Sequence, residues 1–225
     1  MKILVIDIGG NNVKVYSSIE SERRKFPSGP GLTPRAMVAG VKTLAGDWQY
    51  DAISIGYPGP VLHQRIATEP HNLGRGWAGF DFTLAFDRPV RLINDAAMQA
   101  LGGYNGGKML FLGLGTGLGT AMIVDGVLEP MELAHETYRN ATFEDYIGRR
   151  ALKRNGKKIW RAHVVDVIEC LRVALQPDDI LVGGGNVKKL KTLPPGCRRG
   201  SNSDAYTGGV RLWGAQDSSS EYVTS

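Results

Sequence analysis

The sequence has few cysteines, no long apolar run and no Walker-type nucleotide-binding fingerprint. Its two cysteines, Cys170 and Cys197, are too few for a disulfide framework or a four-cysteine metal site. No stretch approaches the roughly 18 uninterrupted apolar residues of a membrane-spanning helix. The pattern GxxxxGK[ST] is also missing, and the one match to GxGxxG, at 74–79, does not follow a predicted strand, so Walker and Rossmann sites have no support.

The amino-terminal segment MKILVIDIGG lacks the features of a targeting sequence. Its apolar run is short, Asp7 interrupts it, and no small-residue cleavage site follows. With 42% apolar and 22% charged residues the composition is that of a globular protein. We therefore expect a cytoplasmic protein with no membrane partner.

The net charge of +5 comes largely from two basic clusters. Such clusters are commonly solvated helix faces, but they also suit a polyanion such as polyphosphate, and both interpretations stay open. Aromatic residues are sparse around them, so a nucleic-acid partner is not expected. The clusters comprise Arg149, Arg150, Lys153, Arg154, Lys157, Lys158 and Arg161, and then Lys188, Lys189 and Lys191.

Apolar runs of strand length interleave with stretches of helical period, which predicts an α/β protein with a parallel or mixed sheet. Two lobes around a cleft fit this pattern, each beginning with a glycine-turned hairpin. We expect a boundary after residue 95, giving lobes 1–95 and 96–225, with the last helix as a candidate to return to the first lobe. Strands are expected at 3–8, 13–16, 52–55, 90–93, 109–113, 121–124 and 180–182, and helices from 34, over 96–101, 160–175 and 205–215, before a frayed Ser-rich tail.

Many of the 30 glycines gather in turns that follow a predicted strand. Glycine lets backbone N–H groups approach phosphate oxygens without a β-carbon in the way. One such turn is commonly a plain hairpin. Three of them, with Asp7 before the first and Lys14 after it, indicate a nucleotide or polyphosphate site.

The segment 7–14, DIGGNNVK, resembles the first phosphate motif, DxGGTxxK, of the ROK family of sugar kinases in the actin–hexokinase superfamily. Further family motifs follow in order along nearly the whole chain. They are GYPG at 56–59, NL and GW within 72–77, FD at 80–81, NDA at 94–96, GTGLG at 115–119, ELAH at 132–135, FEDY at 143–146 and GGG at 183–185.

The resemblance implies a two-lobed actin-like, ribonuclease-H-like ATPase fold with an interlobe cleft. Within the family the chain is most similar to the polyphosphate glucokinases, which lack the zinc-binding CxCGxxGC insert, so zinc is not expected. Three features depart from the family pattern. Asn11 replaces Thr or Ser, Ala134 replaces the Gly of ExGH, and the spacing around Glu144 is shorter.

Asp7 follows an apolar strand, where a charge is costly unless a cation or a hydrogen-bonding turn meets it. We assign it to Mg²⁺ through water, with a turn-stabilising carboxylate as the alternative. Lys14 is expected to contact phosphate or to lie exposed on the hairpin. The resemblance adds as donor-binding positions Gly9, Gly10, Asn11, Gly115, Thr116, Gly117, Gly183, Gly184 and Gly185.

Asp95 is the candidate catalytic base for the acceptor hydroxyl, because it lies at a strand-to-helix switch where a carboxylate can point into a cleft. The alternative is that Asp95 only caps the helix after it. Sugar recognition requires fixed polar groups. For this role the motifs supply Gly59, Asn72, Asn94, Glu132, His135 and Glu144, although the two glutamates also fit solvated surface positions.

We therefore expect a kinase that transfers a phosphoryl group from polyphosphate, ATP or both to the 6-hydroxyl of glucose or a related hexose. The alternatives are a silent sugar-binding protein and a sugar-responsive regulator without its DNA-binding segment, since the first strand begins at Ile3. The family often forms homodimers, and the resemblance implies one by analogy only.

Overall fold

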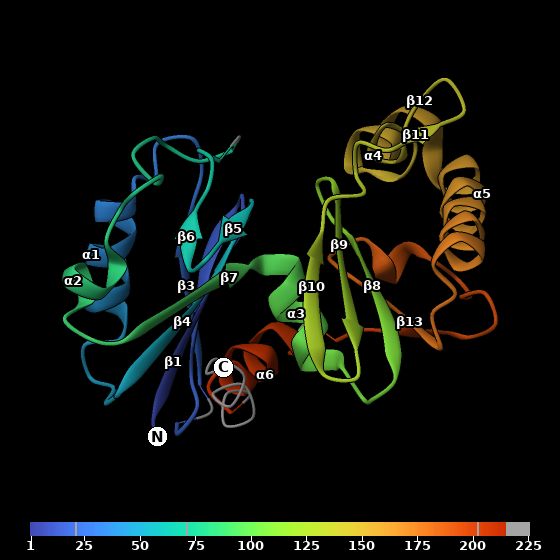
Figure 1. Cartoon of the computed structure of the whole chain (residues 1–225). Coiled ribbons are helices and arrows are strands. Elements are labelled where there is room, and N and C mark those ends of the chain that lie inside the picture. Colours follow the sequence, from blue (N-terminus) through green and yellow to red (C-terminus); the bar gives the residue numbers. More distant parts are fainter. Residues whose placement is uncertain (21, 71, 202, 215–225) are drawn as a thin grey trace, which may run out of the picture. The chain divides into compact units, whose positions relative to one another are not determined.

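The structure is a computed structural model that describes residues 1–20, 22–70, 72–201 and 203–214. The described chain forms two compact units (Figure 1). Unit 1 holds residues 1–98 and 205–214, and unit 2 holds residues 99–204. The lobe boundary expected after Asp95 stays a prediction. The expected Ser-rich tail lies outside the described residues, as does the end of the predicted last helix at residue 215.

Unit 1 is built on a five-stranded sheet in the order β3-β2-β1-β4-β7. β1 pairs antiparallel with β2, which pairs antiparallel with β3, while β1, β4 and β7 run parallel. All six residues of β1 are buried, as its nearly unbroken apolar run predicts. The strands are β1 (Ile3–Ile8), β2 (Asn12–Ser17), β3 (Arg23–Pro27), β4 (Ala52–Tyr57) and β7 (Val90–Asn94).

Helix α1 (Pro34–Leu44) begins where the sequence predicts. The Thr33 side chain accepts a hydrogen bond from Ala36 N at 3.3 Å, and Pro34 occupies the first turn. Its buried face, with Met37 and Val41, joins the hydrophobic core of unit 1. The remaining elements before residue 99 are β5 (Val61–Leu62), β6 (Arg65–Ile66), α2 (Phe82–Phe86) and the start of α3 (Asp95–Gly103).

Helix α6 (Asp204–Arg211) belongs almost wholly to unit 1 and packs on its sheet. A β-carbon at Gly209 would overlap the Val5 side chain, so the helix approaches β1 closely. Ser54 Oγ on β4 donates to Gly209 O at 2.5 Å and accepts from Trp213 Nε1 at 2.9 Å. The end of the described chain is thereby fixed to the first strands.

Unit 2 repeats the strand order of unit 1, as β10-β9-β8-β13-β14. Again the first three strands form antiparallel pairs and the last two run parallel to the central one. A 3-10 turn, η1 (Val187–Lys189), follows β13, and a small hairpin, β11 (Thr137–Tyr138) with β12 (Ala141–Thr142), lies outside the sheet. The sheet strands are β8 (Lys108–Leu114), β9 (Leu118–Val124), β10 (Val127–Met131), β13 (Asp179–Gly183) and β14 (Cys197–Arg199).

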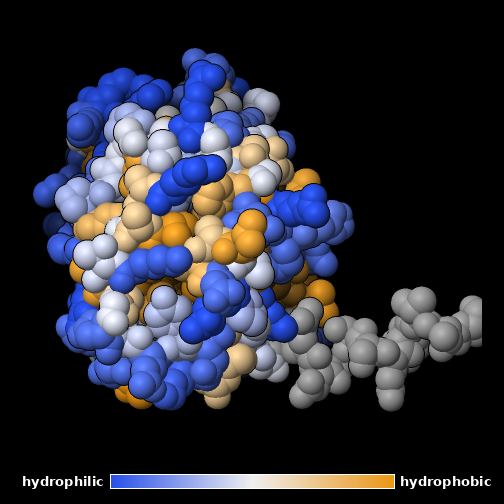
Figure 2. Space-filling view, turned by 90° about the vertical axis from the view of Figure 1, so that its left-hand side faces the viewer, coloured by the Kyte–Doolittle hydropathy of each residue, from blue (hydrophilic) through white to orange (hydrophobic). Residues whose placement is uncertain are grey.

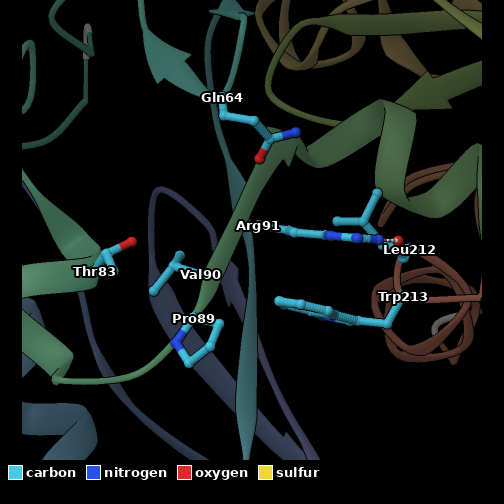
Figure 3. A pocket seen from close by; sticks show the side chains of 7 residues that line it. All are labelled: Gln64, Thr83, Pro89, Val90, Arg91, Leu212 and Trp213. Atoms are coloured by element: carbon cyan, nitrogen blue, oxygen red, sulfur yellow. Dashed lines mark hydrogen bonds between the residues drawn. The ribbon is translucent and has the colours of Figure 1, made fainter. Parts of the chain in front are cut away.

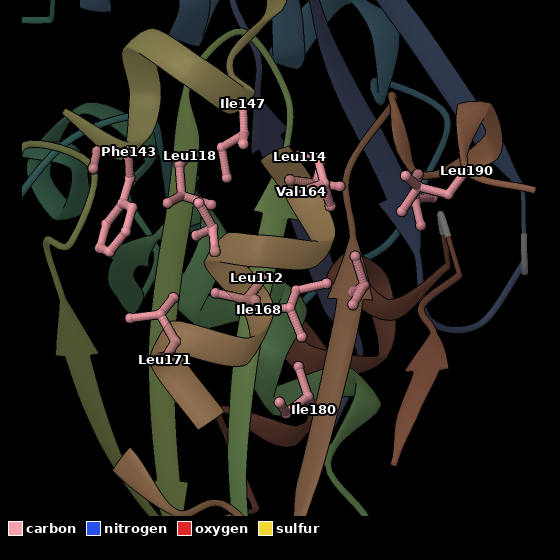
Figure 4. Packing of buried hydrophobic residues seen from close by; sticks show 14 of the residues in the cluster. Leu112, Leu114, Leu118, Phe143, Ile147, Val164, Ile168, Leu171, Ile180 and Leu190 are labelled. Carbon is pink, nitrogen blue, oxygen red and sulfur yellow. The ribbon is translucent and has the colours of Figure 1, made fainter. Parts of the chain in front are cut away.

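Helices α4 (Phe143–Ile147) and α5 (Arg149–Leu175) supply the apolar side chains that cover this sheet. Figure 4 shows Val164, Ile168 and Leu171 of α5 packed toward Leu112 of β8 and Ile180 of β13. The predicted helix over 160–175 is therefore present, but α5 begins earlier, at Arg149. Its first eleven residues are mostly basic and contain Gly156, where the helix kinks with φ 72°, so they lack a helical apolar pattern.

Figure 2 shows the side of unit 1 that carries α1 and α2, where hydrophilic side chains surround smaller hydrophobic patches. Among residues 1–20, 22–70, 72–201 and 203–214, no helix combines the length and apolar character needed to cross a bilayer.

Candidate active site

An ion pair lies at the end of β1, next to the first glycine turn. Asp7 and Lys14 face each other across the β1–β2 hairpin, and Lys14 Nζ lies 2.7 Å from Asp7 Oδ2. The Asp7 side chain is 8% exposed and that of Lys14 is 48% exposed. Lys14 is thus tied to the carboxylate that the sequence assigns to Mg²⁺.

Charges at the same edge of the sheet set the pKa of Lys14. Burial acts to lower this pKa, but the Asp7 carboxylate, with Tyr206 and Asp95 contributing, raises it above its ordinary value. Asp95 directly follows β7, and β1, β4 and β7 are parallel neighbours in register at Asp7, Gly56 and Ile93. The carboxyl ends of these strands therefore bring Asp7, Lys14 and Asp95 to one edge.

Asn94 holds both the start of α3 and the predicted sugar loop. Its Oδ1 accepts from Ala96 N at 2.9 Å and Ala97 N at 3.1 Å, and its Nδ2 donates to Gly59 O at 3.1 Å. Asp95 Oδ1 accepts from Ala96 N at 2.8 Å. Both side chains therefore cap α3: Asn94 accepts hydrogen bonds from two backbone amides and Asp95 accepts one.

The first turn keeps two backbone donors available for a ligand. Gly9 N donates to Asn12 O at 3.0 Å, which closes the turn, and none of the residues 9–12 has a positive φ. Within the described chain, the next two amides, of Gly10 and Asn11, have no recorded acceptor. Two adjacent N–H groups of this kind form an anion-binding feature.

The segment with Asn72 lies beside this turn and is organised by a carboxylate. A β-carbon at Gly10 would lie 3.6 Å from Asn72 Cβ. Glu69 accepts hydrogen bonds from Gly76 N, Trp77 N and Ala78 N at 3.1, 3.2 and 3.1 Å. Desolvation acts to raise the pKa of Glu69, but these three donors hold it below its ordinary value. Sequence reasoning missed Glu69, which has no periodic or motif signal.

In unit 2 two glycine runs lie against each other. Gly184 has φ 81°, and a β-carbon there would lie 2.6 Å from Leu114 O. The buried Asn186, also missed from the sequence, donates from Nδ2 to Gly115 O at 2.8 Å. Its position directly after the GGG run is the signal that was available. The backbones of the glycine runs at 113–117 and 183–185 therefore form one continuous surface.

The second turn repeats the hydrogen-bond pattern of the first. Gly115 N donates to Gly117 O at 3.1 Å, and in the described part of the chain the amides of Thr116 and Gly117 have no recorded acceptor. Thr116 is exposed, and Arg149 N donates to its carbonyl at 3.0 Å. A β-carbon at Gly115 or Gly185 would meet no atom within 4 Å, whereas Gly183 packs on Phe111.

The three predicted sugar-binding side chains of unit 2 come together. Partial burial raises the pKa of Glu132, His135 acts to lower it, and Glu144 raises it further. Glu144 N donates to Ala134 O at 3.0 Å, and a β-carbon at Gly117 would overlap the Glu144 carboxylate. The buried methyl group of Ala134 belongs to the core, so the departure from glycine is accommodated.

Within the described residues, no group of three or more His, Cys, Asp or Glu side chains forms a metal cage. Mg²⁺ usually binds proteins through one or two carboxylates and takes its other ligands from water and substrate phosphates. Asp7 fits that pattern, since Lys14 holds one of its oxygens and the other is available.

A different pocket of unit 1, of about 450 Å³, lies at the opposite end of β7 from Asp95. Figure 3 shows Arg91 extended over Trp213, with the guanidinium 4.4 Å from the ring centroid. Gln64, Pro89 and Val90 also line it. It contains none of the predicted site residues.

The family model described as "ROK family" matches residues 3–129, more than half of the chain. The chain belongs to the ROK family. A curated relative, polyphosphate glucokinase of Mycobacterium tuberculosis (strain ATCC 25618 / H37Rv), is 25% identical over 212 residues, covering 84% of this chain and 80% of the relative.

Two solved structures show the fold. Inorganic polyphosphate/ATP-glucomannokinase from Arthrobacter sp. strain KM superposes with TM-score 0.82 and 23% identity, covering 96% of this chain and 99% of that one. A ROK family glucokinase from Streptomyces griseus, in complex with glucose and AMPPNP, gives TM-score 0.72 and 16% identity, with 94% and 99% covered. The predicted family and the predicted α/β actin-like fold are thereby confirmed. The roles of individual residues stay predictions.

Proposed function

We propose that this ROK protein transfers a phosphoryl group from polyphosphate, ATP or both to the 6-hydroxyl of glucose or a related hexose. The single observation that carries this proposal is the grouping of Asp7, Lys14 and Asp95 at the carboxyl edge of one sheet. Phosphoryl transfer needs charge neutralisation on the donor and a base for the acceptor, and this edge offers both. The names of the relatives and solved structures support the choice of donor and sugar.

In this proposal Asp95 accepts the proton of the acceptor hydroxyl as that oxygen attacks the terminal phosphorus of the donor, and the bridging P–O bond breaks to release the shortened polyphosphate or ADP. Asn94 fixes the neighbouring backbone and the Gly59 loop, so that the carboxylate and the sugar loop keep one relative position. Asn72, Glu132, His135 and Glu144 bind sugar hydroxyls. Each glycine turn offers two backbone amides to phosphate oxygens of the donor.

Mg²⁺ would be held through water by Asp7, and when bound it neutralises charge on the donor phosphates. Lys14 orients the Asp7 carboxylate through their ion pair, and this carboxylate raises the pKa of Lys14. No zinc is required by the residues that we assign.

Asp95→Asn tests the proposal. We expect kcat to fall about 10²- to 10⁴-fold, the usual contribution of a general base, while glucose affinity measured by calorimetry is kept. Asp87→Asn serves as the matched control. Asp87 is exposed and has a positive φ, which asparagine also adopts commonly. Wild-type turnover in the Asp95 variant would show that Asp95 is not the base.

A further inference from the structure

The small hairpin of β11 and β12 connects two of the predicted sugar-binding residues of unit 2. His135 precedes the hairpin and Glu144 follows it. At its base, Glu144 N donates a hydrogen bond to Ala134 O at 3.0 Å, and the pairing of β11 with β12 continues this contact toward the tip. The segment 134–144 is therefore one closed loop, and a change in the position of the hairpin moves both sugar-binding side chains.

A carboxylate on α5 holds the tip of this hairpin. Tyr138 Oη donates a hydrogen bond to Asp166 Oδ2, and Arg139 Nη2 donates to the same oxygen at 2.9 Å. His163, one turn earlier on α5, has its Nδ1 atom 3.3 Å from Tyr138 Oη. The hydrogen bonds from Tyr138 and Arg139 hold the pKa of Asp166 below its ordinary value, so the acceptor is charged at neutral pH. Hydrogen bonds to a charged acceptor are stronger than those between neutral groups.

The backbone at the tip is strained. Arg139 has φ 58°, in the left-handed region that side chains other than those of asparagine and aspartate rarely adopt. Such a conformation persists only where surrounding contacts determine it. The ion pair of Arg139 with Asp166 is about half exposed on both sides and contributes little, whereas Tyr138 is 7% exposed. The buried Tyr138–Asp166 contact is therefore the main anchor of the hairpin.

The third sugar-binding candidate of unit 2, Glu132, is fixed separately, on the sheet. Thr120 Oγ1 of β9 donates to Met131 O at 2.8 Å and accepts from Leu133 N at 3.2 Å, so one hydroxyl holds both neighbours of Glu132. Thr120 is buried. Loss of the contact between the hairpin and α5 should therefore leave Glu132 in place.

We propose that Tyr138 and Asp166 are positioning residues for the sugar site, because their hydrogen bond sets the places of His135 and Glu144 and thereby the affinity for the hexose. The inference deepens the proposed function and rests on its assignment of sugar binding to these two side chains. A sugar is recognised by a few precisely placed polar groups. A displacement of about 1 Å, caused far from the reacting atoms, is enough to cost about 10²-fold in activity.

The test compares two tyrosines of unit 2 that lose the same atom. Tyr138→Phe removes the anchoring hydroxyl and keeps the buried ring. Tyr104→Phe is the matched control, since Tyr104 Oη donates to Gly107 O at 3.0 Å and accepts from Gly126 N at 2.8 Å, outside the segment 134–144. Asp166→Asn keeps an acceptor without the charge, and Asp166→Glu tests rescue by a carboxylate.

Calorimetry with glucose alone measures sugar binding without turnover. We expect Tyr138→Phe to bind glucose about tenfold more weakly and to raise the KM for glucose by a similar factor. Its kcat at saturating glucose should stay within about threefold of the wild type, and its melting temperature should fall no further than that of Tyr104→Phe. Asp166→Asn should also weaken glucose binding, and Asp166→Glu should bind glucose more tightly than Asp166→Asn does.

In the sugar-free protein, amide hydrogen exchange across the segment 134–144 should become faster in Tyr138→Phe and stay unchanged in Tyr104→Phe. This measurement reports the loss of the anchor even where no sugar is added.

Wild-type glucose affinity in Tyr138→Phe, or equal losses in the two phenylalanine variants, would overturn the inference and leave the proposed function intact wherever the wild type phosphorylates glucose. If Tyr138→Phe weakens glucose binding but the wild type phosphorylates no hexose with either donor, the proposed function fails and the positioning role stands. A wild-type protein that binds no hexose would overturn both.

Discussion

The two units share a strand order but place charge differently at their glycine turns. In unit 1 the position two residues before the turn is Asp7, which pairs with Lys14; in unit 2 the corresponding position is Gly113, which pairs with Gly119. Both turns are closed by the amide of their first glycine. The charge at the turn of unit 1 therefore comes from the strands themselves, and that of unit 2 comes from α5 and η1.

Each unit also fixes a loop with one asparagine amide. Asn94 Nδ2 donates to Gly59 O in unit 1, and Asn186 Nδ2 donates to Gly115 O in unit 2. Variants at the positions that differ between the two units should separate effects on catalysis from effects on folding stability.

Among the positions that differ between the two units, the largest effect should come from Asp7→Asn, which removes a charge that unit 2 lacks at the corresponding position. We expect kcat to fall about 10²- to 10³-fold, as for loss of one preorganised electrostatic group. Stability should change by about 1 kcal/mol or less, because Lys14 is half exposed and can turn to water. Asp47→Asn breaks an exposed ion pair with Arg24 and is the control. A large loss of thermal stability with normal turnover would show that Asp7 stabilises the fold and does not act in catalysis.

Gly184→Ala should act on folding. Its φ of 81° and the 2.6 Å approach to Leu114 O predict a cost of about 1–3 kcal/mol, which lowers the melting temperature by about 2–4 °C for each kcal/mol. Gly185→Ala, with no atom within 4 Å, should change stability by less than about 0.5 kcal/mol and raise the donor KM instead. Equal melting temperatures for the two variants would contradict the close packing of Gly184 against Leu114 O.

The smallest effect is expected in the pH dependence of stability, through the loop whose backbone amides bond to Glu69. The folded pKa of this carboxyl is lowered, so its stabilising effect is full above the unfolded value of 4.5 and is lost as pH falls through the folded value. We expect the fluorescence of the buried Trp77 to change over that acidic range, and Glu69→Gln to remove this component. An acid transition that is identical in the variant would exclude Glu69 as its source.

The sequence predicts the buried strands well because their apolar runs are long and their ends are marked by glycine. β1 matches its expected bounds, and β4, β7, β8 and β13 extend one or two residues further. Edge strands such as β3, with the sequence RRKFP, have no apolar pattern and were missed. The pattern located Asp7 and Asn94 at the ends of strands, where the structure has them, but hydrogen bonds across long sequence separations, such as that of Asn186 to Gly115, require the fold.

The most direct measurement is the product formed by the wild-type protein from glucose with long-chain polyphosphate and, separately, with ATP. Glucose 6-phosphate, identified by phosphorus NMR in a magnesium-containing buffer, is the expected product with at least one of the two donors. Absence of phosphorylated sugar with both donors, across glucose and its close hexose relatives, would contradict the assignment of Asp95 and the glycine turns to phosphoryl transfer.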